Sequence, residues 1–182
     1  MARNTLARSM HDVGLAAWFG GTLANAVALN AAAAQADNPA RKGAVANVGW
    51  DRWTPVNAAA IGSHLIGSVV QLAADAPRVA GQRGVGSMVM VKTALTVMAL
   101  GATAYSRALG KKVSAQTDVP AESGTEPAAT TPDDVASAQR RLAMLQWAVP
   151  ALTGALVVVS AFAGEQQRAS EVHKGFMRRI VG

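Results

Sequence analysis

LAMLQWAVPALTGALVVVSAFAG, residues 142–164, contains no charged side chain. As a helix rising 1.5 Å per residue it would be roughly 33 Å long, which matches a hydrocarbon core about 30 Å thick. A helix of that length on a soluble protein would carry a charged face, and this stretch has none. It therefore predicts a membrane-spanning helix.

Three further stretches have the same character: residues 13–36, 53–74 and 84–106. Lys92, in the third of these, is the only formal charge among them. A chain of 182 residues with four spans leaves room for one membrane domain. The sequence predicts an all-α integral membrane four-helix bundle that forms a single domain over residues 1–182.

The composition narrows the classes of partner. The net charge is +6, but the Lys and Arg residues flank the spans, so anionic lipid head groups are the expected counter-charge and nucleic acid is not. There is no cysteine, which rules out disulfides, thiolate metal sites and a cysteine nucleophile.

The connections differ in composition. Residues 37–52 are predicted to form a short loop of mixed charge, and residues 75–83 a tight turn. Residues 113–132 are rich in Thr, Pro, Ala, Ser and Glu, which predicts a mobile, disordered loop between the third and fourth spans. Each side of the membrane receives eight Lys or Arg residues, so the charge rule does not decide orientation. The short N-terminus, with Arg3 and Arg8 beside the first span, favours an orientation with both termini in the cytoplasm. The expected location is the plasma membrane, as a multi-pass protein.

Each span carries a stripe of polar residues at helical spacing. Polar side chains at membrane depth avoid lipid, so the stripes predict a partly polar inner face. Two interpretations are open: hydrogen bonding between helices, worth about 0.6 kcal/mol each, or a path for a ligand or proton. The residues of this face are Asn25, Asn57, His64, Gln71, Lys92 and Gln146.

His64 lies near the middle of its span and is interpreted as a buried, neutral, hydrogen-bonded side chain. A haem would need a second ligand at the same depth, and the sequence places His11 at the end of the first span and His173 in the tail. No cofactor and no metal site are therefore expected. Lys92 either extends to the head groups or pairs inside the bundle with Asp75 or a partner subunit.

Small residues predict where helices approach closely. Ala24, Ala28 and Ala32 recur every four positions, and Ser63 and Gly67 repeat the pattern in the second span. The sequence shows no nucleophile elbow, zinc-protease motif, phosphate loop or paired intramembrane carboxylates, so no catalytic residue and no enzymatic activity are predicted.

The tail, residues 165–182, has apolar residues four apart and basic residues on another face. Such a helix lies in the membrane interface or docks on a partner. The residues expected to contact a partner or lipid are Val172, Lys174, Phe176, Arg178 and Ile180.

Three stretches carry a family resemblance: HDVGLAAWFGG at 11–21, SRALGKKV at 106–113, and LQWAVP at 145–150 continuing to GEQQR at 164–168. They resemble the small four-span membrane proteins of actinobacteria known as respiratory supercomplex association factors, found with the cytochrome bcc–aa3 supercomplex. The resemblance implies a partner and no active site.

Two functions are therefore kept. The first is a non-catalytic accessory membrane subunit associated with a respiratory cytochrome bcc–aa3 supercomplex, in contact with membrane lipids and subunits of that complex. The alternative is a small membrane carrier or ligand-binding bundle that uses the polar inner face around His64. A membrane haem protein is a third hypothesis, which the expected depths of the histidines oppose.

Overall fold

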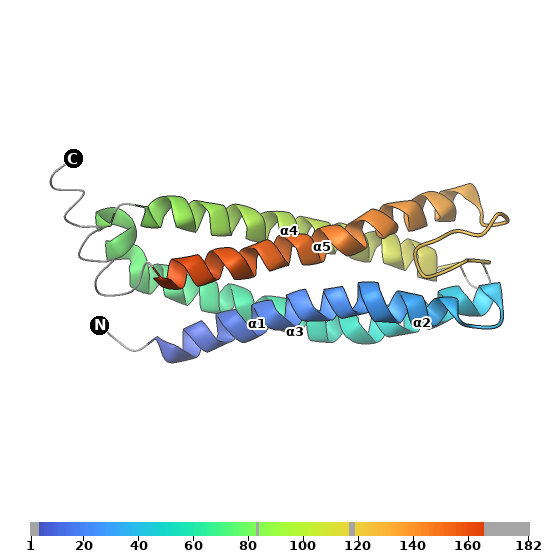
Figure 1. Ribbon diagram of the computed structural model, residues 1–182, viewed down its shortest axis with the longest axis horizontal. Coiled ribbons are helices and arrows are strands. Elements are labelled where there is room, and N and C mark those ends of the chain that lie inside the picture. Colours follow the sequence, from blue (N-terminus) through green and yellow to red (C-terminus); the bar gives the residue numbers. More distant parts are fainter. Residues whose placement is uncertain (1–3, 83, 117–118, 166–182) are drawn as a thin grey trace.

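The computed structural model describes residues 4–82, 84–116 and 119–165. Four helical rods lie side by side, with the start of the first and the end of the last at the same end of the bundle (Figure 1). The first rod is continuous but contains a π-helical turn. The elements are α1 (Thr5–Ala24), the π-turn η1 (Asn25–Leu29), α2 (Asn30–Ala34), α3 (Pro39–Gly81), α4 (Val85–Ser114) and α5 (Asp133–Glu165).

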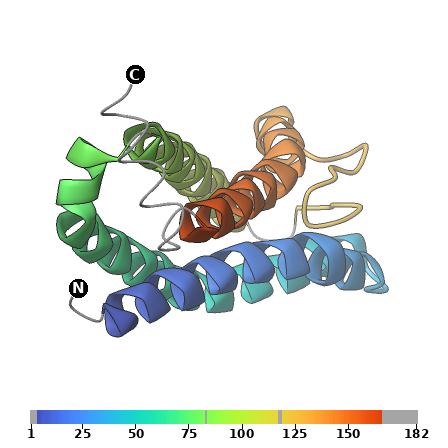
Figure 2. The same ribbon diagram turned by 60° about the vertical axis from the view of Figure 1, so that its left-hand side comes forward.

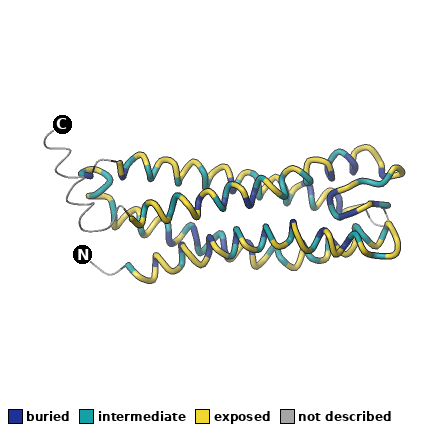
Figure 3. The backbone as a smooth tube through the Cα atoms, in the orientation of Figure 1, coloured by how far each residue is buried: buried dark blue, intermediate teal, exposed yellow. Residues whose placement is uncertain are grey.

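All four rods are long and apolar enough to cross a membrane, which confirms the all-helical bundle with four candidate spans. Large apolar side chains are exposed on the outside of the bundle: Met90 is 73% exposed, Phe162 61% and Ile66 56%. The buried positions gather where the rods face one another and at one end of the bundle (Figure 3). A surface of this kind is stable in lipid, where exposed apolar side chains carry no penalty.

Two predicted connections are helical instead. Residues 37–52 were expected to form a loop, but α3 begins at Pro39, whose fixed backbone angle suits a first helical position. The side chain of Asn38 caps this helix by accepting a hydrogen bond of 2.9 Å from the Ala40 amide. At the other end α3 continues through Pro77, and the chain turns only around Gly84, which has a φ of 87°.

The rods pack as two pairs, α1 with α3 and α4 with α5 (Figure 2). A cluster of Trp18, Ala60, Ala99 and Val149 takes one residue from each rod and joins the pairs. Trp18 is fully buried, and its indole N–H donates to the Thr103 hydroxyl at 3.2 Å. This cluster, called the central plug below, fixes the level at which the four rods meet.

The segment 119–132 packs on the bundle. The amide of Ala121 donates to the Pro39 carbonyl at 3.2 Å, and the Thr131 hydroxyl donates to the Pro120 carbonyl at 2.6 Å. The composition predicted a segment without fixed contacts, but short polar side chains here bond nearby backbone, and Val119 packs against the apolar cluster of Leu109, Val113, Val135 and Ala138. Its mobility stays a prediction. Its buried residues are Ala121, Ser123, Thr125 and Thr131.

Charged pairs surround this segment. They join Asp51 to Arg107 at 2.7 Å, Lys42 to Glu122 at 3.5 Å, and Lys112 to Asp134 at 3.5 Å. We call this part of the molecule the polar end; it comprises residues 37–52, 107–116 and 119–141.

Candidate functional site

One sequence pattern occurs twice where α1 crosses α3. Residues 7–14 (ARSMHDVG) and 60–67 (AIGSHLIG) both read Ala-x3-His-x2-Gly. A Cβ added at Gly14 would lie 2.5 Å from the carbonyl oxygen of Ala60. A Cβ added at Gly67 would lie 2.5 Å from the carbonyl oxygen of Ala7. The two backbones therefore touch, and the two patterns meet in a local two-fold arrangement that sequence reasoning had not found.

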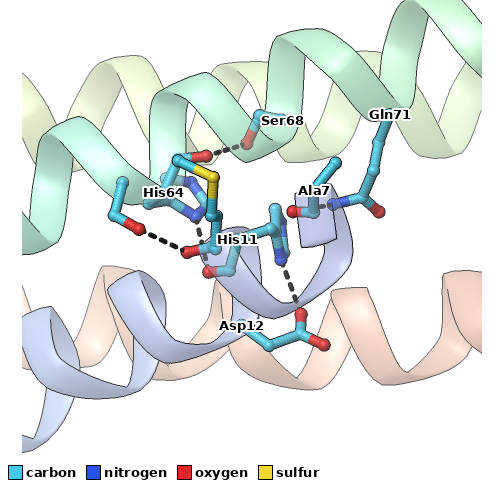
Figure 4. Close-up of polar contacts among 8 residues, drawn as sticks. Ala7, His11, Asp12, His64, Ser68 and Gln71 are labelled. Carbon is cyan, nitrogen blue, oxygen red and sulfur yellow. Dashed lines mark hydrogen bonds and ion pairs between the residues drawn. The ribbon is translucent and has the colours of Figure 1, made fainter. Parts of the chain in front are cut away.

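The crossing brings His11 and His64 together. Their ring centroids are 4.6 Å apart with the planes tilted by 48°, and the residues are 2% and 0% exposed. Nδ1 of His11 lies 2.7 Å from a carboxylate oxygen of Asp12, and Nδ1 of His64 lies 3.4 Å from the His11 carbonyl oxygen (Figure 4). Nε2 of each ring is buried and has no hydrogen-bond partner among the described residues.

The expected difference in depth between these histidines is wrong. The helix begins at Thr5, not near Val13, so His11 lies two turns inside the first rod and level with His64. The two rings pack directly against each other, which leaves no space for a porphyrin between them. Within the described ranges, no group of three His, Cys, Asp or Glu side chains is placed to hold a metal ion.

A cavity of about 700 Å³ lies between the two pairs of rods, on the side of the plug where α1 begins and α5 ends. We call it the termini-side cavity. Its deep wall is apolar and includes Leu65, Leu100 and Val157. The ionisable and amide side chains near the termini, together with Ser160, are Arg8, His11, Asp12, Gln71, Asp75, Arg78 and Lys92. Ser68, Thr93 and Thr96 also line the cavity, and the hydroxyls of Ser68 and Thr96 donate to carbonyls of their own helices.

Some charged side chains on that wall have a partner of opposite charge, and Lys92 does not have one among the described residues. Asp75 pairs with Arg78 at 3.1 Å, and Asp12 with the His11 ring. Lys92 is attracted by Asp12 and Asp75, but among the described residues its ammonium has no hydrogen bond or ion pair. The direct Lys92–Asp75 pair that was one of the sequence-based alternatives is not formed.

A second cavity of about 320 Å³ lies on the other side of the central plug. This loop-side cavity is lined by Trp50, Trp53, Asn57 and Thr103, among others. The indole N–H of Trp53 and the side-chain oxygen of Asn57 are buried there without a partner among the described residues.

Asn30 organises the wall of the loop-side cavity and was missed. It donates to the Gln146 side-chain oxygen at 2.7 Å and accepts from the Trp50 indole at 3.2 Å. In an ordinary α-helix a residue five positions after Asn25 turns to another face, but the π-turn between them widens the spiral and turns Asn30 inward. The α-helical spacing of polar residues in the sequence therefore does not predict that Asn30 faces inward.

The other expected inner-face residues are divided between the cavities. Gln71 donates to the Ala7 carbonyl at 3.4 Å on the termini side, whereas Asn57 and Gln146 line the loop-side cavity. Asn25 buries an amide nitrogen that has no partner within the described ranges.

The close-packing prediction was right for one rod and wrong for the other. Gly67 does meet a backbone, and the Ser63 hydroxyl donates to the Met10 carbonyl at 3.0 Å. The alanines expected to pack in the first span are exposed instead: Ala24, Ala28 and Ala32.

The five tail residues expected to touch a partner or lipid (Val172, Lys174, Phe176, Arg178 and Ile180) lie outside the described residues. No family model, curated protein or solved structure matches the chain. Structural evidence about the function therefore comes from the geometry of the two cavities and of the polar end.

Proposed function

We propose that this chain is a non-catalytic accessory subunit of a larger complex in the plasma membrane, and that the complex is a cytochrome bcc–aa3 respiratory supercomplex. The resemblance in its three sequence stretches supports this class of partner. The observation that supports association most directly is the polar end, which offers a fixed surface beyond the membrane.

The length of α3 explains why this end must project. Its 43 residues span about 64 Å, whereas a bilayer with its head groups is about 40–45 Å thick. Trp50 and Trp53 suit the membrane interface, so residues 39–49 extend about 16 Å past it. The Lys42–Glu122 ion pair and the packed segment 119–132 hold this extension in place.

Two apolar side chains lie exposed on the projecting turns. Val45 is 44% exposed and Val48 54%, and their spacing of three places them on one face of α3. Beyond the hydrocarbon no lipid chain covers them, and apolar surface left in water is a common mark of a protein contact.

The test is recovery of partner subunits with the tagged full-length chain. The double variant Val45→Gln, Val48→Gln should reach the membrane at a normal level and recover several-fold less oxidase. Ala129→Gln, an exposed change on the segment at the same end, is the matched control and should recover the normal amount. Unchanged recovery with the double variant, or a wild-type chain that purifies alone, would overturn the proposal.

The proposed topology places both termini in the cytoplasm and the polar end outside. The chain has no cysteine, so single cysteines report their side without background. With an impermeant maleimide on intact cells, Ala129→Cys should be labelled and Ser9→Cys should not. The reverse pattern would invert the topology.

The alternative of a small carrier is favoured by one observation, the pair of cavities on either side of the central plug. A carrier must open each cavity in turn, whereas a static subunit need not. Thr96→Cys reports on the termini-side cavity and Thr103→Cys on the loop-side cavity. A carrier predicts that each is labelled from both sides of the membrane, and a static bundle predicts labelling from one side only.

A further inference from the structure

We propose that the termini-side cavity is a binding site for one acidic phospholipid, with the phosphate at Lys92 and the acyl chains along the apolar wall. The proposal gives a ligand to the alternative function above, and it needs neither transport nor a respiratory partner. Lipid retention tests this proposal, cysteine labelling tests the carrier function, and subunit recovery tests the accessory-subunit function. Each can therefore fail without the others.

The first step is access from the bilayer. Three apolar residues of the wall are strongly exposed: Val69 is 66% exposed, Val97 61% and Leu72 45%. They come from α3 and α4, which contact each other less than the helices within each packed pair, and we infer that the cavity opens toward lipid between these two helices. A hydrophobic ligand can enter sideways without crossing water.

The second step is the polarity of the wall. Its charged residues lie in the first turns of α1 and α4 and the last turns of α3, close to the bilayer surface. Its deep residues, such as Leu65, Leu100 and Val157, are apolar. A phospholipid has the same order, with the charged group at the surface and the chains below. About 700 Å³ is within the usual range for a ligand pocket and holds a head group with the upper parts of the chains.

The third step is the sign of the charge on the ligand. Asp75 and Asp12 each have a partner, whereas the Lys92 ammonium has none among the described residues. An unpaired cation about two turns inside a membrane helix is costly, and a phosphate would neutralise it. Ser160 lies on the same wall, and its hydroxyl is buried without a partner in the described part of the chain. The wall has three cations (Arg8, Arg78 and Lys92) and two carboxylates (Asp12 and Asp75), and this excess of positive charge favours an anionic head group over a zwitterionic one with the same phosphate.

Native mass spectrometry of the detergent-purified full chain measures the binding. The probes are phosphatidylglycerol and phosphatidylcholine with identical chains, with inorganic phosphate as competitor. The wild type should retain phosphatidylglycerol preferentially at one site, and excess inorganic phosphate should not displace it. Lys92→Gln should weaken retention about five- to tenfold. Lys111→Gln removes the same charge from an exposed position at the polar end of α4 and should change nothing.

A second pair of variants keeps Lys92 and tests the apolar wall, in case Lys92→Gln fails to fold. Val97→Trp fills the cavity from the lipid side and should weaken retention, whereas Val91→Trp, exposed on the same helix outside the lining, should not. Equal retention of both lipids, equal loss in either matched pair, or displacement by inorganic phosphate would each overturn the proposal.

Discussion

His64 shows how a polar side chain is tolerated at membrane depth. The only hydrogen bond of the His64 ring among the described residues is the 3.4 Å contact with the His11 carbonyl. His64→Gln retains a donor for that carbonyl and should leave assembly and respiration near normal. His64→Leu loses the bond and should lower stability by roughly 0.5–1 kcal/mol, measured by thermal unfolding in detergent. Loss of respiratory activity in the Gln variant at a normal protein level would instead indicate a proton or ligand role.

At this scale the sequence predicted part of the site. It placed His64 in the interior because a titratable side chain in an apolar run avoids lipid, and the structure agrees. It misplaced His11 because Arg8 and Asp12 made the first two turns of α1 look like a solvated end. Charge content alone does not reveal that a helix has already begun.

Among the elements, the α1–α3 crossing depends on two glycines. Gly14→Ala or Gly67→Ala would place a methyl group 2.5 Å from backbone atoms that cannot rotate away, so the helices must separate. We expect a loss of about 1–3 kcal/mol. Gly62→Ala is the control on the same helix, because a Cβ there meets nothing within 4 Å. Thermal unfolding that is equal for Gly67→Ala and Gly62→Ala would contradict the tight crossing.

The π-turn allows a second test with a matched residue in the same rod. Asn30→Leu removes partners from Gln146 and Trp50 and should destabilise the protein by about 1–2 kcal/mol in unfolding measurements. Asn25→Leu removes an amide nitrogen without a partner in the described part of the chain, so its effect should be small or favourable. A larger loss for Asn25→Leu would mean that the turn does not orient the two residues as described.

The number of elements followed from the apolar runs, but their ends did not. Lipid thickness explains the length of a span, whereas the extension of α3 to Pro39 depends on an Asn cap and on contacts with the segment 119–132. Long-range contacts of that kind leave no periodic pattern. The same reasoning explains why Gly14 was missed: its partner is 46 positions or more away in the sequence, at Ala60 and His64.

For the whole molecule, the two ends present different surfaces to a partner. The polar end is fixed by ion pairs, and the termini-side cavity lies at the other end of the bundle, where α5 ends at Glu165. If the tail is a second point of attachment, truncation after Gln167 should reduce recovery of oxidase subunits several-fold while the four spans remain in the membrane. Electron transfer within the partner should persist.

Two double variants of the full chain distinguish attachment of the tail to lipid from attachment to a protein partner. Lys174→Gln with Arg178→Gln removes attraction to anionic head groups, and Val172→Ser with Phe176→Ser removes the apolar face. A protein contact through the apolar face predicts that the serine pair lowers subunit recovery more than the glutamine pair, because lipid attraction is not specific to a partner. If the full truncation recovers as much oxidase as the intact chain, the tail is not an attachment point, and any association must come from the polar end or the lipid-facing helices.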